Sequence, residues 1–190
     1  MVPGSSHLGN VGLTFDDGPH PEYTPRILAT LDRFNAKAVF FLQGDQAEKH
    51  PELVKQIFET GHQLGNHAYN HPHLRELSAT QYIAEVENTQ TLLDQIVGQS
   101  LPKLFRPPYG ELGFNVTPRL MVKGYRHILW SHDSRDSFIK DASELTNHVK
   151  SFQMNGGEIL LFHDDYRRTV EILNELLLHW QELGCRTVLI

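Results

Sequence analysis

Two adjacent carboxylates, Asp16 and Asp17, follow an apolar run from Val11 to Phe15. The run predicts a buried strand, and Gly18-Pro19 breaks it, so both side chains are expected at the mouth of a sheet. Two neighbouring negative charges repel each other, and a cation beside them offsets this repulsion. A metal ion could be that cation. An ordinary turn at the end of a strand is the alternative interpretation, because Asp-Gly-Pro is common turn chemistry.

Two histidines, His67 and His71, stand four residues apart. On a helical turn this spacing places both imidazoles on one face, where they could bind one metal ion together. Together with one carboxylate, the two imidazoles would give the metal three protein ligands and leave coordination positions open for water, as in catalytic metal sites. The chain contains 12 histidines, so a chance pair at this spacing is the competing interpretation.

Other polar groups also follow predicted strands. Arg106 is followed by two prolines and could hold a carboxylate, and the backbone N–H of Tyr109 could donate to an oxyanion. His163 ends a very apolar strand and could be a general acid oriented by Asp136 or Asp133. Each of these residues also has a purely structural interpretation: a rigid loop for Arg106 and the prolines after it, a core histidine for His163, and a solvated loop for Asp133 and Asp136.

Strands and helices alternate along the chain. The expected strands span residues 11–15, 38–42, 62–65, 103–105, 127–130, 158–162 and 186–190. The expected helices span residues 26–34, 51–60, 78–97, 117–123, 142–152 and 169–183. Thr24 is expected to cap the first helix, with Pro25 as its first residue.

This alternation predicts an α/β fold with a parallel sheet covered by helices. If the sheet closes into a barrel, all loops after strands lie on one face, where barrel enzymes place their sites. With about seven strands, a complete eightfold barrel is not expected. An open, doubly wound sheet is the alternative, but no strand is followed by the glycine-rich dinucleotide fingerprint.

The composition excludes several functions. The chain has 190 residues and a formal charge of −6, so it lacks the basic surface that nucleic acids require. No apolar run reaches the ~20 residues that span a bilayer. The one cysteine, Cys185, cannot form an internal disulfide and is expected to be buried. Residues 1–10 are expected to be a tail or linker, and the protein is expected to be a monomer.

Five segments stand in order along the chain: Thr14-Phe15-Asp16-Asp17-Gly18-Pro19, His67-x-x-x-His71, Arg106-Pro107-Pro108-Tyr109-Gly110, Asp133-Ser134-Arg135-Asp136 and Leu160-Leu161-Phe162-His163-Asp164. Together they resemble the five motifs of the polysaccharide deacetylases of carbohydrate esterase family 4, the NodB-homology domain. The resemblance extends over residues 11–190, which would form one catalytic domain. It implies a distorted, incomplete (β/α) barrel, in agreement with the strand count.

The resemblance also implies a role for each matching residue. A divalent metal, usually zinc, with cobalt, nickel or manganese as alternatives, would be bound by Asp17, His67 and His71. Asp16 would be the general base, tethered by Arg106. His163 would be the general acid, oriented by Asp136.

Five residues would contact the substrate. The backbone N–H of Tyr109 would donate to the oxyanion, and Leu161 would line the pocket for the acetyl methyl group. Pro107, Trp130 and Phe138 would form walls of the sugar groove. The aspartate of the fourth motif is usually followed by tryptophan, and the first histidine of the second motif by serine or threonine. Here Ser137 and Ala68 stand at those positions.

The leading functional prediction is a metal-dependent hydrolase that removes N-linked acetyl groups from N-acetylglucosamine polymers, either chitin-type or peptidoglycan. Such a substrate implies a secreted or cell-envelope protein. The same site could instead hydrolyse O-acetyl esters of xylan or a small cyclic amide. A catalytically inactive carbohydrate-binding homologue is the third alternative, although such proteins generally lose a ligand or a catalytic carboxylate, and none is missing here.

Overall fold

The computed structural model describes residues 9–190, so the tail expected over residues 1–10 lies outside the described residues except for Gly9 and Asn10. The strands are β1 (Asn10–Asp16), β2 (Val39–Leu42), β3 (Gln63–Asn66), β4 (Leu104–Phe105), β5 (Arg126–His127), β6 (His132–Asp133), β7 (Ile159–His163) and β8 (Arg186–Val188). The α-helices are α1 (Tyr23–Arg33), α2 (Gly44–Lys49), α3 (Pro51–Glu59), α4 (Ala79–Val97), α5 (Thr117–Val122), α6 (Ala142–Lys150) and α7 (Arg167–Glu182). Two short 3₁₀ helices are η1 (Leu74–Glu76) and η2 (Pro108–Gly110).

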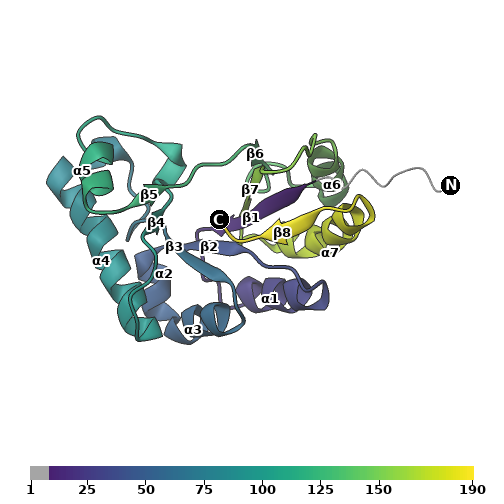
Figure 1. Ribbon diagram of the computed structural model, residues 1–190, viewed down its shortest axis with the longest axis horizontal. Coiled ribbons are helices and arrows are strands. Elements are labelled where there is room, and N and C mark those ends of the chain that lie inside the picture. The colour runs from purple at the N-terminus through teal and green to yellow at the C-terminus, as the bar shows by residue number, and fades with distance from the viewer. Residues whose placement is uncertain (1–8) are drawn as a thin grey trace.

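The strands form one parallel sheet in the order β5-β4-β3-β2-β1-β7-β6, with β8 paired to β1. Within residues 9–190 the two end strands, β5 and β6, do not pair with each other. The chain between them crosses from the α4 and α5 end of the molecule to the α6 and α7 end (Figure 1). The expected incomplete parallel barrel is therefore confirmed.

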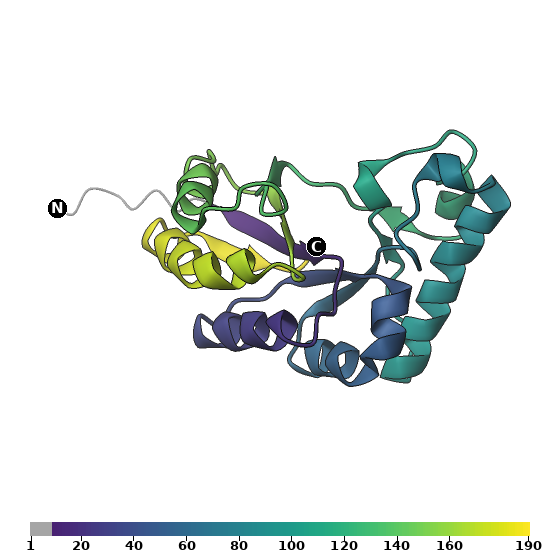
Figure 2. The same cartoon turned by 180° about the vertical axis from the view of Figure 1, so that it is seen from behind.

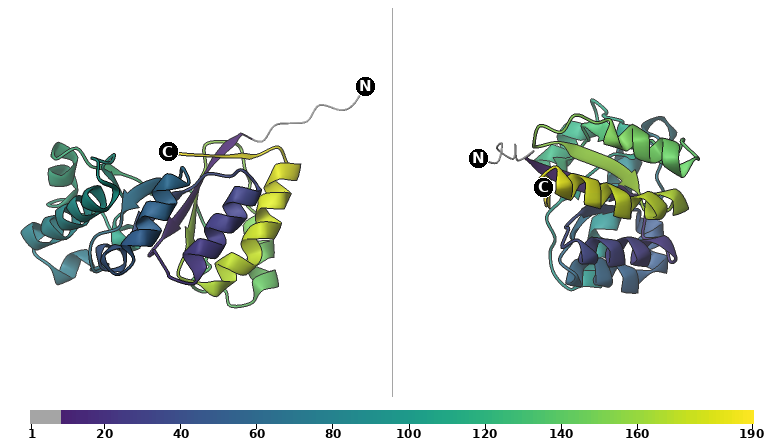
Figure 3. Two further views of the ribbon diagram at one scale, coloured as in Figure 1. Left: turned by 90° about the horizontal axis from the view of Figure 1, so that it is seen from below. Right: turned by 90° about the vertical axis from the view of Figure 1, so that its right-hand side faces the viewer.

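Alternation along β1 places its apolar side chains on one face of the sheet. Val11, Leu13 and Phe15 are buried in the larger core, which they share with residues of α1 and α7. These two helices lie side by side over the sheet (Figure 3). A fully buried leucine, isoleucine or phenylalanine contributes about 1.5–3 kcal/mol, so this layer fixes the position of β1. Thr14 and Asp16, on the alternate positions, face the other side.

A second layer at the opposite end of the sheet supports β3 and β4. It comprises buried side chains of α4, α5 and the adjacent strands, including Tyr82, Val86, Phe105 and Leu120. Seen from behind, α4 and α5 lie at one end of the sheet and α6 and α7 at the other (Figure 2). In the described part of the chain, no helix is both long and apolar enough to cross a membrane.

Several expected elements differ in the structure. Thr24 lies inside α1 and not at its cap, because its hydroxyl donates to Asp164 and accepts from the His20 N–H. The helix α2 and the strand β6 were not expected. The strand expected over residues 127–130 is confined to β5, since residues 128–131 form no ladder. Cys185 is only partly buried, against the larger core.

Candidate active site

Except for Leu161, which lies within β7, the candidate residues stand at the carboxyl end of a strand or in the loop that follows it, so they meet at one edge of the sheet. There a cleft of about 480 Å³ opens between the loops. Its lining residues are Asp16, Asp17, His67, His71, Pro107, Tyr109, Trp130, Asp133, Ser137, Phe138, Leu161, His163 and Tyr166. The remaining two candidates, Arg106 and Asp136, lie behind this lining and are fully buried.

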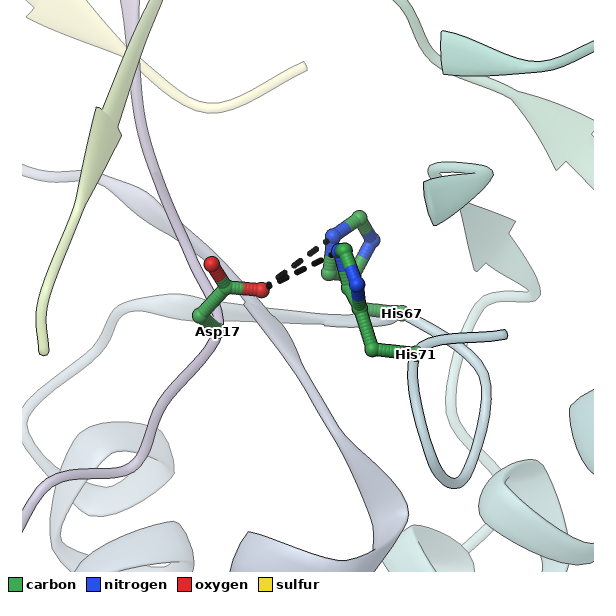
Figure 4. A group of neighbouring side chains, drawn as sticks. All are labelled: Asp17, His67 and His71. Atoms are coloured by element: carbon green, nitrogen blue, oxygen red, sulfur yellow. Dashed lines mark ion pairs between the residues drawn. The ribbon is translucent and has the colours of Figure 1, made fainter. Parts of the chain in front are cut away.

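Asp17, His67 and His71 point toward one another (Figure 4). Oδ1 of Asp17 lies 3.5 Å from Nε2 of His67 and 3.4 Å from Nε2 of His71. Ligand atoms bound to zinc at about 2.0–2.2 Å and tetrahedral angles lie roughly 3.3–3.6 Å apart. The two separations and the donor set therefore fit a zinc ion, with room for further ligands from the cleft.

The contacts around these ligands favour the forms that bind a metal. Nδ1 of His67 donates to the Arg106 carbonyl at 2.7 Å, so in the neutral imidazole the lone pair is on Nε2, the atom directed toward Asp17. Burial, and next the charge of His67, lower the pKa of His71 and so favour its neutral imidazole. Burial would raise the pKa of Asp17, but three neighbouring histidines and the Gln43 amide outweigh it and hold that pKa below its ordinary value.

The expectation of a helical turn between His67 and His71 is wrong. The segment is irregular, and both Ala68 and His71 adopt the left-handed region, with φ of 61° and 54°. This loop brings the two imidazole rings to 4.9 Å between centroids. Asp17 is left-handed as well, with φ of 75°, a region that aspartate tolerates better than most residues. Loop geometry, and not helix periodicity, brings the three side chains together.

Gly18 and Asp164 explain the shape of the loop after β1. A Cβ at Gly18 would overlap the carboxylate of Asp164, so only glycine fits there. Asp164 is fully buried, its backbone N–H donates to the Asp16 carbonyl at 3.1 Å, and Thr24 donates to its carboxylate at 2.5 Å. Burial raises the pKa of Asp164 to about 8, so this side chain supports the loop as a largely neutral acid.

Asp16 also lines the cleft, and its carboxylate is held by Arg106. Nη1 of Arg106 donates to Oδ1 of Asp16 at 2.8 Å and to the hydroxyl of Thr14 at 2.7 Å. Thr14 in turn donates to the Leu160 carbonyl at 2.6 Å. Oδ2 of Asp16 faces Nε2 of His67 at 3.7 Å. One oxygen of the Asp16 carboxylate is therefore fixed by the guanidinium, and the other is directed toward the group formed by Asp17, His67 and His71.

The rest of the Arg106 guanidinium is satisfied by backbone and by an aromatic ring. Nε donates to the Ile128 carbonyl at 3.1 Å and Nη2 to the Leu129 carbonyl at 3.3 Å. The guanidinium carbon lies 4.2 Å from the centroid of the Phe41 ring, a favourable cation–π distance. These contacts leave the side chain a single orientation.

His163 and Asp136 form a hydrogen-bonded pair at the opposite wall. Nδ1 of His163 donates to Oδ1 of Asp136 at 2.6 Å, and the backbone N–H of His163 donates to Oδ2 at 2.8 Å. Thr169 donates a further hydrogen bond to Oδ2 at 2.6 Å. Burial would lower the pKa of His163, but the hydrogen bond and charge of Asp136 outweigh it and raise that pKa to about 10. Nε2 of His163 therefore carries a proton at neutral pH and lies 3.9 Å from Oδ2 of Asp17.

Comparison with known proteins now identifies the family. The family model described as polysaccharide deacetylase matches residues 5–128. The chain belongs to the polysaccharide deacetylase family.

A peptidoglycan-N-acetylglucosamine deacetylase of Bacillus cereus is 40% identical over 157 residues, which are 83% of this chain and 57% of that relative. A chitooligosaccharide deacetylase of Azorhizobium caulinodans is 32% identical over 84% of this chain and 76% of its own length. The crystal structure of the Bc1960 peptidoglycan N-acetylglucosamine deacetylase superposes with a TM-score of 0.90 at 34% identity, over 98% of this chain and 88% of that one. The chain therefore spans little more than half the length of the Bacillus cereus relative.

The walls of the cleft are aromatic. Tyr109 is left-handed, with φ of 58°, and within residues 9–190 its backbone N–H donates to no protein acceptor. The Trp130 ring packs against Gly110, the residue that follows Tyr109. A Cβ on Gly110 would lie only 2.8 Å from this ring. Phe138 is 76% exposed at the rim. Pro107 and Leu161 complete the lining.

Tyr166 lines the cleft although no motif includes it, and Asp133, expected only to orient His163, lines the cleft as well. Asp133 and Ser137 line the cleft beside Phe138, and Tyr166 meets the His163 ring at 84°. Tyr166 follows the fifth motif by two residues, which is the one sequence signal that could have indicated it. Thr14 belongs to the first motif, but its hydrogen bond to Arg106 has no signature in the sequence.

Proposed function

We propose that this chain is a metal-dependent hydrolase that removes the acetyl group from the nitrogen of N-acetylglucosamine residues in a polysaccharide, with peptidoglycan as the first substrate to test. One observation carries the proposal. A group of metal-binding type, Asp17 with His67 and His71, shares its cleft with a carboxylate tethered by Arg106 on one side and an imidazole hydrogen-bonded to Asp136 on the other.

The residues that fit the metal are Asp17, His67 and His71. When bound there, a divalent ion would polarise the acetyl carbonyl and lower the pKa of a water molecule from 15.7 towards about 7. Zinc suits two imidazoles and a carboxylate, with cobalt, nickel and manganese as alternatives.

Asp16 and His163 would handle the protons. Asp16, held by Arg106, would accept a proton from the attacking water as the carbon–oxygen bond forms. The backbone N–H of Tyr109 would donate to the carbonyl oxygen as negative charge develops on it. Nε2 of His163 would protonate the amide nitrogen as the carbon–nitrogen bond breaks, because an amine leaves poorly as an anion. The products are acetate and a free amino sugar, and each proton transfer is worth typically ~10²–10⁴ in rate.

The substrate side of the proposal draws on the relatives, whose names include peptidoglycan and chitooligosaccharide deacetylases. The exposed aromatic walls of the cleft suit the apolar faces of sugar rings. Such polymers lie outside the cytoplasm or in the cell envelope, and we propose that location for this protein, which we expect to act as a monomer.

The test is acetate release from N-acetylated peptidoglycan fragments and chitooligosaccharides, with acetylated xylan at matched concentration. We expect release from the N-acetylated substrates, loss of activity with a strong chelator, and loss with Asp16→Asn. Acetate release from acetylated xylan alone would show that the site hydrolyses O-acetyl esters and would contradict N-deacetylation. Binding of the polymers by zinc-loaded protein without acetate release would identify an inactive homologue.

A further inference from the structure

A set of contacts outside the catalytic groups joins the loops that carry His71 and Tyr109. Oε1 of Glu111 accepts a hydrogen bond from Nδ1 of His73 at 2.9 Å, and Oε2 accepts one from the Leu74 N–H at 2.8 Å. Glu111 follows Tyr109 by two residues, and His73 follows His71 by two residues. One carboxylate therefore closes the loop at 106–111 onto the loop at 67–73.

The aromatic rings continue this connection to the proposed metal site. The His73 ring is stacked on the Tyr109 ring, with centroids 3.6 Å apart and planes 8° apart. The Tyr109 ring meets the His71 ring edge-on, at 4.5 Å and 68°. Contact thus runs from Glu111 through His73 and Tyr109 to His71.

The backbone at both ends of this chain of contacts needs such support. His71 and Tyr109 are non-glycine residues in the left-handed region, with φ of 54° and 58°. Such a conformation is strained for a non-glycine residue and persists only where the surroundings fix it. The turn hydrogen bonds from the Gly110 and Glu111 N–H groups hold the backbone of the second loop, but they do not orient either ring.

We infer that Glu111 and His73 are positioning residues, which hold the Tyr109 ring against His71 and so fix both the ligand and the oxyanion-binding N–H. The inference rests on the proposed function in taking His71 as a metal ligand. Neither residue faces the reacting groups directly, since neither lines the cleft. Their effect passes through Tyr109 and His71.

Zinc affinity of the whole chain tests the inference without substrate, by titration of the metal-free protein in competition with a chromogenic chelator. Glu111→Ala and His73→Ala are expected to weaken zinc binding about 10–100-fold, the usual effect of losing a group that orients a ligand. Both are expected to lower kcat with little change in KM. His73→Phe keeps the stacked ring and loses only the hydrogen bond, so it should recover most of the loss.

Glu48 provides a matched control. Its carboxylate accepts a hydrogen bond from the Tyr69 hydroxyl at 2.7 Å, on the loop that carries His71 but away from the Tyr109 ring. Glu48→Gln is expected to leave zinc affinity and kcat unchanged. If Glu111→Ala does not fold, Glu111→Gln preserves the shape of the side chain, and a smaller loss in the same direction is expected.

Two results would overturn the inference: wild-type zinc affinity and kcat in folded Glu111→Ala and His73→Ala, or an equal loss in Glu48→Gln and Glu111→Gln. A wild-type chain that binds zinc but releases no acetate would refute the proposed reaction and leave the zinc series to decide the inference. Zinc binding unaffected by Asp17→Ala would refute the proposed site and the inference with it.

Discussion

The guanidinium of Arg106 lies 2.8 Å from the carboxylate of Asp16, and both side chains are almost completely buried. Removing one partner of a buried pair leaves the other charge uncompensated, at a cost of roughly 3–5 kcal/mol. Arg106→Met is therefore expected to lower the free energy of unfolding by about that amount and to abolish activity. Urea denaturation of the variant, alone and combined with Asp16→Asn, checks this expectation. If the double variant is no more stable than Arg106→Met, the cost does not come from the stranded carboxylate.

Thr14 is expected to matter through its hydroxyl. Thr14→Val keeps the shape of the side chain but removes the acceptor for Arg106 and the donor to the Leu160 carbonyl. Leaving buried partners unsatisfied costs about 1–3 kcal/mol, so stability should fall by that much and kcat should fall as Arg106 loses its orientation. Thr14→Ser keeps the hydroxyl and should preserve kcat. Equal kcat values for the valine and serine variants would argue against a positioning role.

The pair His163 and Asp136 predicts a pH dependence of stability in the metal-free protein. The folded pKa of His163, raised to about 10, lies above the ordinary value of 6.5. The stabilisation is therefore fully present below about pH 6.5 and is lost as the pH rises through about 10. Asp136→Asn removes the charge that raises this pKa, so its stability deficit should be largest near pH 6.5 and shrink towards pH 10. A deficit that stays constant over this range, measured by thermal or urea unfolding, would contradict the pairing.

Phe138 tests the sugar groove separately from the chemistry. Its side chain is 76% exposed, so Phe138→Ala should change stability by less than about 0.5 kcal/mol. Loss of roughly 1 kcal/mol of apolar contact with a sugar ring would raise KM about five-fold with kcat unchanged. Steady-state kinetics on an N-acetylated oligosaccharide measure both constants. A fall in kcat at constant KM would place Phe138 outside the binding groove.

The sequence predicted the place of the catalytic side chains because parallel strands end at one edge of the sheet. Asp16, Arg106 and His163 each follow an apolar strand, so their meeting in one cleft depends only on topology. The same reasoning failed for β6, His132–Asp133, which is two residues long and carries no apolar alternation. A strand of that length forms only because β7 offers it a partner.

Local geometry within the loops was not predictable from residue types. The spacing of His67 and His71 suits a helix, yet left-handed residues at Ala68 and His71 bring the rings together without one. The stacking of His73 on Tyr109 joins loops that lie far apart in the sequence. Such contacts depend on the tertiary arrangement of two irregular segments, for which the sequence has no periodic signal.

The unpaired edge between β5 and β6 has a consequence for Arg106. Consecutive carbonyls of a strand point to opposite neighbours, where a closed ring of strands would use them for pairing. Because residues 128–131 stay outside any ladder, the carbonyls of Ile128 and Leu129 are left to accept hydrogen bonds from the arginine. Completing the barrel at this seam would take at least one of these two carbonyls from the guanidinium, so the gap in the ring contributes to holding the arginine that tethers Asp16.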